Sequence, residues 1–355
     1  MLIPAILVTL IGCGGSGGGS VSASGSQLTG TTTGSTTGAS TGSTTGTGST
    51  TGSTTGTTTG GAGIPDLGPG ADMHGYVPFP GDNAWNTPID TAPVDPNSAN
   101  LIASIGPNTG LHPDFGANWN GGPFGIPYVV VAGTQAKVPM NFQYAGESDP
   151  GPYPFPPTAP IEGGASSSGD RHVLVIDRNH KLLFETFSSY PQSSGASWNC
   201  GSGAKFDLTT NAFRPAGWTS ADAAGLPIFP GLVRYDEVVT LGQINHALRF
   251  TVQHTREAYV SPARHYASSD TNPNLPPMGM RVRLKAGFDI TTFPPHIQVI
   301  LACLKKYGMI VADNGSNWYI SGAPDARWSD SELNTLKAIT GSNFQVVQMG
   351  TVTGP

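Results

Sequence analysis

Side chains capable of acid–base chemistry are concentrated in one stretch of the chain, from Leu226 to Asp270. This stretch contains three of the eight histidines and four of the ten arginines, in a chain whose charged residues make up only 11% of the total. Functional sites gather titratable groups because neighbouring groups shift one another's pKa values. The stretch is therefore the first candidate for a binding or catalytic site.

The segment Arg264-His265-Tyr266 offers the three roles that cleavage of a uronate polymer by elimination requires. An arginine can neutralise the uronate carboxylate, a histidine can take the proton from the adjacent carbon, and a tyrosine can protonate the leaving oxygen. His246, in the same stretch, is a further candidate for a catalytic residue. These side chains predict a polysaccharide lyase.

Hydrolysis by two carboxyl groups is the rival mechanism. The carboxyl groups considered for it are those of Asp170, Glu185, Asp236, Glu237 and Asp313. Adjacent residues on a strand point to opposite faces, so Asp236 and Glu237 cannot act together. Glu237 would then need a distant partner, and we choose Asp313, in the turn after a strand. For any single acid, capping a loop or pairing with an arginine is the alternative role.

A basic strip follows if the strands expected at 245–254 and 280–285 share one face of a sheet. Arginine binds carboxylates through two parallel hydrogen bonds, so the strip would suit a uronate-containing polymer. A solvated sheet face with scattered ion pairs is the alternative. The candidate substrate-binding residues are Arg249, Gln253, Arg264, Arg281 and Arg283, with Trp119 as either a ligand platform or a loop residue packed on the core.

The motifs of several enzyme classes are absent from the sequence. There is no HExxH, no P-loop, no GxSxG and no GxGxxG after a strand, which argues against zinc proteases, nucleotide enzymes and serine hydrolases. His246 and His254, eight residues apart on one strand, would lie about 26 Å apart, too far to share a metal. We expect no metal site and no cofactor, with Ca²⁺ bound by the Asp- and Asn-rich loops as the alternative.

The elements that position these residues are mostly short strands. Strands are expected at 127–132, 136–144, 171–177, 181–187, 245–254, 280–285, 309–313, 317–320 and 344–349. Helices are expected at 294–307, where apolar residues recur every three or four positions, and after the capping box of Ser329 and Glu332. The segment 64–125 is expected to be irregular. These elements predict a mainly β fold, resembling a β-sandwich or jelly roll, with two or three peripheral α-helices; an α+β fold is the alternative.

The N-terminus predicts export. Residues 1–11 are apolar, and Leu10-Ile11-Gly12-Cys13 resembles a bacterial lipoprotein signal, which implies a lipid on Cys13. A plain secretory signal is the alternative. Residues 14–63 are almost wholly Gly, Ser and Thr and predict a disordered linker, so residues 64–355 would form a single secreted globular domain.

The charge of the chain limits its partners. Its 17 basic and 23 acidic residues give a formal net charge of −6, which disfavours nucleic acid and anionic membrane surfaces. We expect a monomer on the extracellular or outer-membrane surface, attached to the membrane only by its lipid, with an extracellular polysaccharide as partner. Cys200 and Cys303 would form a disulfide in an oxidising compartment, or remain two buried thiols.

These observations predict a surface-anchored enzyme that cleaves a polysaccharide, either a lyase for a uronate-containing polymer or a glycoside hydrolase. A non-catalytic glycan-binding or adhesion lipoprotein would use the same aromatic residues and arginines, and is the main alternative. Another secreted hydrolase or a structural protein of the cell envelope is the third. The titratable groups gathered in 226–270 favour an enzyme, since a binding module does not need them.

Overall fold

The computed structural model describes residues 63–354, all of which belong to one compact unit. The expected signal, Cys13 and all of the expected linker except Gly63 lie outside the described residues. Within the described part of the chain, no helix is long and apolar enough to cross a membrane.

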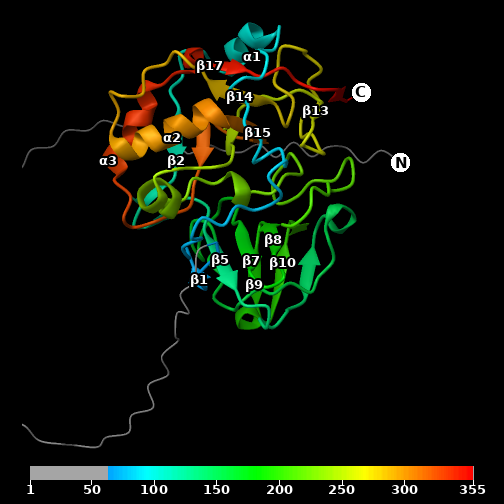
Figure 1. Ribbon diagram of the computed structural model, residues 1–355. Coiled ribbons are helices and arrows are strands. Elements are labelled where there is room, and N and C mark those ends of the chain that lie inside the picture. Colours follow the sequence, from blue (N-terminus) through cyan, green and yellow to red (C-terminus); the bar gives the residue numbers. More distant parts are fainter. Residues whose placement is uncertain (1–62, 355) are drawn as a thin grey trace, which may run out of the picture. The chain divides into compact units, whose positions relative to one another are not determined.

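A five-stranded sheet occupies one half of the unit (Figure 1). Its strands, in spatial order, are β1 (Gly68–Pro69), β5 (Tyr128–Val131), β7 (Val173–Asp177), β8 (Leu182–Phe187) and β11 (Ser202–Asp207). β5 and β7 run parallel, and the other pairs are antiparallel. All residues of β5 and β7 are buried, as expected for strands covered on both faces.

A six-stranded sheet occupies the other half. Its spatial order is β17 (Phe344–Val346), β14 (Arg281–Leu284), β15 (Met309–Asn314), β12 (Leu248–Val252), β16 (Tyr319–Ser321) and β2 (His112–Asp114). The pairs β12–β15 and β16–β2 are parallel. Alternation along β12 places Leu248, Phe250 and Val252 in the core and turns Arg249 and Thr251 to the opposite face.

Three small sheets complete the strands. The three-stranded sheet contains β6 (Met140–Phe142), β10 (Ser197–Cys200) and β9 (Tyr190–Gln192), while β13 (Tyr259–Val260) pairs with β18 (Val352–Thr353) and β3 (Gly116–Trp119) with β4 (Gly122–Phe124). The β3–β4 hairpin follows β2 directly, separated from it only by Phe115, which is buried.

The helices α1 (Ser98–Ile105), α2 (Pro295–Lys306) and α3 (Asp330–Leu333) gather around the six-stranded sheet (Figure 1). The apolar stripe of α2 packs into the same core as Leu248 and Phe250, through Ile297, Ile300 and Leu304. Burying each such side chain stabilises the fold by about 1.5–3 kcal/mol. The remaining helical turns are η1 (Ala145–Glu147), η2 (Ser193–Gly195), η3 (Phe229–Gly231), η4 (Asp236–Leu241, a π-helix), η5 (Asn334–Ala338) and η6 (Gly341–Asn343).

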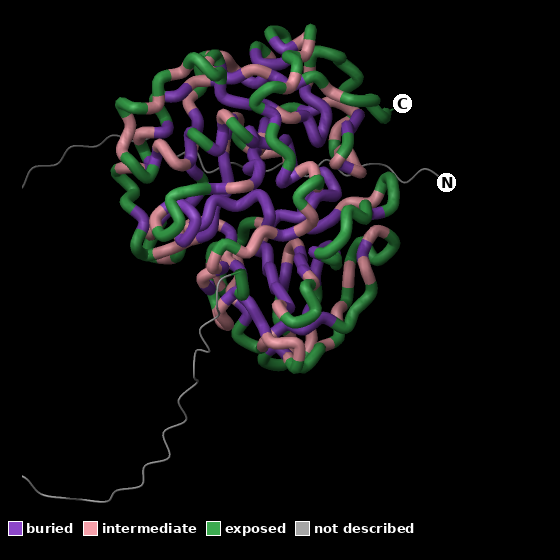
Figure 2. Tube along the Cα trace, viewed as in Figure 1, coloured by how far each residue is buried: buried purple, intermediate pink, exposed green. Residues whose placement is uncertain are grey.

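Buried segments run through the strands of both large sheets (Figure 2). The apolar residues form three clusters, of which the largest lies between the six-stranded sheet and its helices. Phe229 and Leu232, which follow the loop 219–228, pack into the core of the five-stranded sheet. Ala224 and Leu226, within the loop, belong instead to the core of the six-stranded sheet, so this part of the chain packs against both sheets.

The expectation of a sheet-rich fold with few helices is confirmed. A β-sandwich is not confirmed, and three of the sheets contain a parallel pair. The segment 64–125 is less irregular than expected, since it contains α1 and four strands. The strand expected from Asn245 begins only at Leu248, because His246 is held in a buried polar network before it.

The expected disulfide is wrong: Cys200 and Cys303 are free, buried thiols. Cys200 belongs to the apolar cluster of the three-stranded sheet, whereas Cys303 belongs to that of α2 and the six-stranded sheet. The Cys303 thiol donates to the backbone carbonyl of His246, 3.1 Å away. Burial raises the pKa of the Cys200 thiol to about 11 and raises that of Cys303 as well, which keeps both thiols protonated and unreactive.

Candidate functional site: a carboxyl cluster on the open sheet face

Arg249, on β12, lies at the centre of a cluster of charged residues. Its Nε and Nη2 atoms donate to the two carboxylate oxygens of Asp222, at 3.1 and 2.9 Å, and its Nη1 donates to the Ser321 hydroxyl at 2.5 Å. The carboxylate of Asp313 lies 3.9 Å from Nη2. Arg249 and Asp222 are both nearly inaccessible to solvent, so their positions are fixed and the other charged groups are arranged around them.

Sheet register places two further acids on the same face as Arg249. Thr251 is the neighbour of Asp313 on β15, and Ser321 is the neighbour of Asp114 on β2. Residues directly in register on adjacent strands point to the same side of a sheet. Asp313 and Asp114 therefore lie on either side of Arg249, on the face opposite the core, which we call the open sheet face.

The other half of the unit contributes Glu162, Asp170 and His172, the last two immediately before β7. The His172 ring nitrogens lie 2.7 Å from a Glu162 carboxylate oxygen and 3.0 Å from the backbone carbonyl of Ala221. Both partners accept hydrogen bonds, so the ring must carry two N–H groups and a positive charge. His172 thereby links Glu162 to the residue that precedes Asp222.

The electrostatics agree with that charge on His172. Burial opposes it, but the charge of Glu162 and its hydrogen bond dominate and raise the pKa of His172 to about 9. Burial likewise tends to raise the pKa of Glu162, and the charge and hydrogen bonds of His172 turn the shift downward. The pair is therefore ionised at neutral pH.

The outer carboxyl groups hold their protons more tightly than free acids do. Burial raises the pKa of Asp313 well above its usual range, Asp222 adds to this effect, and Arg249 opposes it. Partial desolvation by the surrounding protein, together with the charges of Glu162 and Asp170, raises the pKa of Asp114 to about 6 against the effect of Arg249, although the residue as a whole is exposed. Burial also raises the pKa of Asp170. The cluster thus contains two carboxyl groups, those of Asp313 and Asp114, whose pKa values are raised well above that of a free acid.

The cluster is accessible at its outer members. The Asp313 and Glu162 side chains are 24% and 25% exposed, and Asp114 is exposed to solvent. The members are five carboxyl groups (Asp114, Glu162, Asp170, Asp222 and Asp313) and only two cations (Arg249 and His172), both already paired. Two carboxyl groups that reach solvent and have raised pKa values are suited to general acid and general base catalysis.

Glu237 and His246 lie elsewhere, in an enclosed network. Glu237 accepts a hydrogen bond from Arg234 at 2.6 Å and lies 3.1 Å from Nε2 of His246. The Glu237 and His246 side chains are 7% and 1% exposed. These two side chains are therefore nearly inaccessible to solvent in this structure, and the catalytic roles assigned to them remain a prediction.

Arg264, His265 and Tyr266 lie beside the loop that carries Asp222. Nδ1 of His265 lies 2.7 Å from the backbone carbonyl of Ala223, and its ring stacks on Tyr266, with ring centres 6.0 Å apart. Nε of Arg264 donates to the backbone carbonyl of Arg214. All three are partly buried, and the catalytic roles assigned to them remain a prediction.

The expected basic strip is not formed. Arg249 is neutralised by Asp222, Arg281 donates to the backbone carbonyls of Ala84, Thr87 and Tyr307, and Arg283 donates to that of Ile89. Arg281 and Arg283 thus donate to backbone acceptors within the fold and Arg249 to an internal carboxylate, so these guanidinium groups are already engaged and do not present the bidentate donors expected for a uronate.

Trp119 and Gln253 are exposed. Trp119 stands on β3 with 65% of its surface accessible and contacts Phe124 of β4, their ring centres 5.8 Å apart. The structure thus places Trp119 five residues after Asp114 on the hairpin that follows β2. Its role in substrate binding remains a prediction.

Asp114, Glu162 and Asp222 were missed by sequence reasoning. Each lies in a Gly-, Ala- or Ser-rich segment with no periodicity, and each is more than 45 residues from the next in the chain. Asp170 is only one of several acids that the sequence offers for hydrolysis, and His172 is not among the predicted site residues. The sequence Ser220-Ala-Asp-Ala-Ala-Gly225 did contain a signal, because one acid stands within a run of small residues. Most of this run is buried in the structure.

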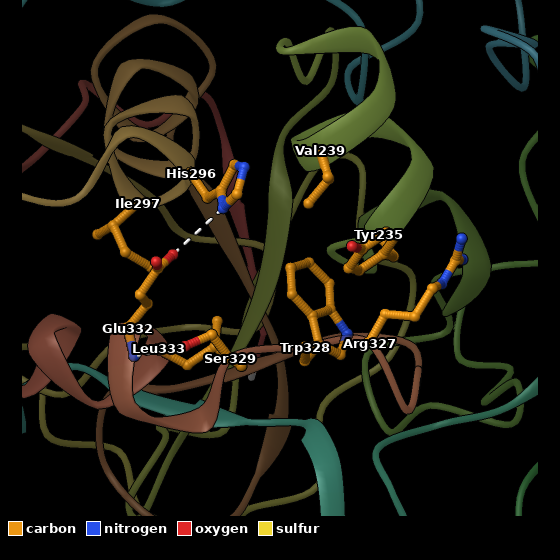
Figure 3. Close-up of a pocket in the computed structure, with 9 residues that line it drawn as sticks. All are labelled: Tyr235, Val239, His296, Ile297, Arg327, Trp328, Ser329, Glu332 and Leu333. Atoms are coloured by element: carbon orange, nitrogen blue, oxygen red, sulfur yellow. Dashed lines mark hydrogen bonds and ion pairs between the residues drawn. The ribbon is translucent and has the colours of Figure 1, made fainter. Parts of the chain in front are cut away.

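A cavity in the six-stranded half of the unit lies apart from this cluster. It has a volume of about 90 Å³ and is lined by residues of η4, α2 and the segment 327–333, with Trp328 and Tyr235 inside it and the His296–Glu332 ion pair at its rim (Figure 3). None of the cluster's carboxyl groups lines it. Within residues 63–354, no group of three or more His, Cys, Asp and Glu residues could hold a metal ion.

No family model, curated protein or solved structure matches this chain.

Proposed function

We propose that the protein is a polysaccharide hydrolase that uses the carboxyl cluster around Arg249. The observation that carries this proposal is the placement of Asp313 and Asp114, two solvent-accessible acids with raised pKa values, on the open sheet face on either side of Arg249. Asp313 would protonate the leaving glycosidic oxygen, and Asp114, ionised above about pH 6, would act as the base or nucleophile.

The charge of the cluster favours hydrolysis over elimination. A lyase must bind a uronate carboxylate beside a cation or a polarised donor. Here five carboxyl groups surround two cations that are already paired, so a uronate would be repelled. We therefore propose a neutral polysaccharide as the substrate, rather than the uronate polymer expected from the sequence.

A non-catalytic glycan-binding lipoprotein is the second candidate. The observation that favours it is the exposure of Trp119, since sugar rings stack on exposed aromatic faces. In that case carboxyl substitutions would leave binding intact and no product would form. For either function we propose that the protein acts at the cell surface, anchored through Cys13. Comparing detergent partitioning of the natural chain with that of Cys13→Ser tests the anchor.

The function is tested by incubating the full chain with neutral polymers (xylan, mannan, β-1,3-glucan and α-1,4-glucan) and acidic ones (alginate and polygalacturonate). We expect new reducing ends from a neutral polymer, without the ultraviolet absorbance of an unsaturated uronate. Asp313→Asn should lower the rate about 10²–10⁴-fold, as expected for loss of a general acid.

Asp330→Asn is the matched control, because Asp330 is an exposed acid on α3, outside the cluster. Cleavage of an acidic polymer that produces the ultraviolet absorbance of an unsaturated uronate would contradict the proposal. It would favour the lyase mechanism predicted for His265 and Tyr266. Full activity of both Asp313→Asn and Asp114→Asn would remove the carboxyl cluster as the catalytic site.

A further inference from the structure

We propose that His112 and Tyr319 form a sugar-binding subsite next to the carboxyl cluster, on the same open sheet face. This inference rests on the proposed function, since it identifies residues that would hold a neutral sugar ring beside Asp114 and Asp313. It adds two residues to the site that the sequence did not suggest.

The register of β16 and β2 places the pair. Tyr319 lies opposite His112, two residues from the neighbouring pair of Ser321 and Asp114. Two residues along a strand correspond to about 6.6 Å on the same face. On its other side, Tyr319 is the neighbour of Thr251, which is itself the neighbour of Asp313. His112, Tyr319, Thr251 and Asp313 therefore form one row across four adjacent strands.

The two rings support each other. Their centres lie 4.0 Å apart with an angle of 11° between the ring planes, so each ring covers one face of the other. Both residues are partly exposed. Because side chains stand upright on a sheet, the stacked rings present their edges to a ligand rather than a flat surface. The subsite would therefore act through hydrogen bonds at the ring edges.

The pair has polar atoms that could form such bonds. Among the described residues, the Tyr319 hydroxyl makes no hydrogen bond to the protein, whereas Nδ1 of His112 is shielded from solvent and has no side-chain partner. A ligand on this face would therefore contact the Tyr319 hydroxyl and the other edge of the His112 ring, which carries Nε2. Burial and the charge of Lys337 lower the pKa of His112, so its ring is neutral and offers one donor and one acceptor.

These groups define the class of ligand. A tyrosine hydroxyl can donate and accept, as a sugar hydroxyl does, and Nε2 of a neutral imidazole can donate or accept according to the tautomer. Adjacent hydroxyls of an uncharged pyranose ring match this set. A carboxylate would gain no charge-assisted contact from the pair and would lie close to Asp114. The subsite therefore takes a neutral sugar residue of the polymer.

Two variants remove the hydrogen-bonding atoms while keeping the ring stack, Tyr319→Phe and His112→Phe. Tyr144→Phe is the matched control, because Tyr144 is an exposed tyrosine in the turn after β6, away from this face. Each protein, with Asp313→Asn alongside, is run through native gels that contain xylan, mannan, β-1,3-glucan or α-1,4-glucan. The polymer that slows the natural chain is then used to measure kcat and KM.

We expect Tyr319→Phe and His112→Phe each to weaken polymer binding about 5–10-fold, the effect of losing one hydrogen bond, with a matching rise in KM and kcat within about twofold. The Asp313→Asn variant should lose turnover, but the polymer in the gel should still slow its migration. Unchanged retardation and KM in both ring variants would overturn the subsite while leaving the catalytic proposal intact.

The reverse failure is also recognisable. If Asp313→Asn remains fully active while Tyr319→Phe and His112→Phe lose binding, the subsite stands and the catalytic assignment fails. A fall in kcat with unchanged KM in both ring variants would overturn the subsite, because it would show that they act on the reaction rather than on binding. If no neutral polymer slows the natural chain in the gel and the natural chain cleaves none of them, both proposals fail.

Discussion

Arg249 and Asp222 form a bidentate ion pair in which each side chain is almost completely removed from solvent, at 5% and 0% exposure. Arg249 comes from β12 of the six-stranded sheet, and Asp222 from the loop that leads to it from the five-stranded sheet. The pair therefore fixes the position of that loop and carries the charge around which Asp313 and Asp114 are arranged. Its energetics and its effect on catalysis can be tested separately.

Breaking this pair should strongly destabilise the fold. Arg249→Met leaves the Asp222 carboxylate buried without a partner, and removing one member of a buried pair costs about 3–5 kcal/mol. The double variant with Asp222→Leu removes both charges and should recover most of that loss. Urea unfolding followed by tryptophan fluorescence measures both changes.

The exposed pair of Arg327 and Asp325 is the control for this experiment. Arg327 is 64% exposed, so Arg327→Met should change the free energy of unfolding by less than about 1 kcal/mol. Equal losses in the Arg249 and Arg327 variants would mean that the buried pair contributes no more than a surface one.

The pH dependence of activity should follow the two raised pKa values. Burial and the neighbouring acids Glu162 and Asp170 raise the pKa of Asp114 to about 6, so the rate should fall as the pH drops below about 6 and the base is protonated. Burial and the charge of Asp222 raise the pKa of Asp313 well above its usual range, so this acid should lose its proton at a higher pH than a free carboxyl group, and the rate should fall on the alkaline side of that point. The profile of kcat/KM from pH 4 to 10 measures both limbs, and a rate that keeps rising down to pH 4 would contradict the assignment of Asp114 as base.

His172 should stabilise the fold in a defined pH window. Its folded-state pKa is about 9, because the Glu162 contacts outweigh burial, and is thus above that of an unfolded histidine, near 6.5. A histidine whose pKa is higher in the folded than in the unfolded state stabilises the fold fully at pH values below its unfolded-state pKa. This contribution is lost as the pH rises through its folded-state pKa. Compared with the natural chain, His172→Gln should therefore lose most stability near pH 6 and the difference should shrink between pH 6.5 and 9.

Thermal unfolding across that range measures the His172 effect. His180→Gln is the matched control, since His180 also contacts an acid, Asp177 at 2.7 Å, but is 60% exposed. Its Tm difference should be small at every pH. A His172→Gln difference that does not change with pH would show that the ring contributes by packing and not by its charge.

Much of the framework could be predicted from the sequence, because its signals are local. The apolar stripe of α2 lies within a few turns, and the cap of α3 requires only Ser329 and the Glu332 backbone three residues later. The helix α1 was missed although Leu101, Ile102 and Ile105 repeat at helical spacing before Gly106. Its surroundings, rich in Pro and Asn, concealed that short pattern.

The site itself could not be predicted in the same way. Asp313 was identified as one member of a carboxyl pair, but its neighbours come from distant segments of the chain: sheet register brings Arg249 and Asp114 to it, and loops bring Glu162, Asp170 and Asp222. Glu237 and His246 illustrate the converse: they are close in sequence, yet Arg234 and the π-helix η4 enclose them in a network that solvent does not reach. Density of reactive side chains along the chain thus proved a poor guide to accessibility.

Glu185 provides the last prediction, since it is a fully buried acid whose carboxylate accepts hydrogen bonds from the backbone N–H groups of Ile228 and Phe229, at the start of η3. Burial outweighs these hydrogen bonds and raises its pKa to about 7, with Asp222 adding to the shift. The folded chain then binds more protons than the unfolded chain between about pH 4.5 and 7, so this group's contribution to stability falls as the pH rises through that range.

A glutamine at position 185 keeps an oxygen acceptor for the two N–H groups and cannot ionise. Glu185→Gln should therefore equal or exceed the natural chain in stability at pH 8, and its free energy of unfolding should fall less between pH 4.5 and 7. Urea unfolding at pH 5 and pH 8 measures the difference, with Glu332→Gln as the control at a partly exposed acid. If Glu185→Gln is less stable than the natural chain by the same amount at both pH values, the ionised carboxylate is a favourable cap and burial does not dominate its pKa.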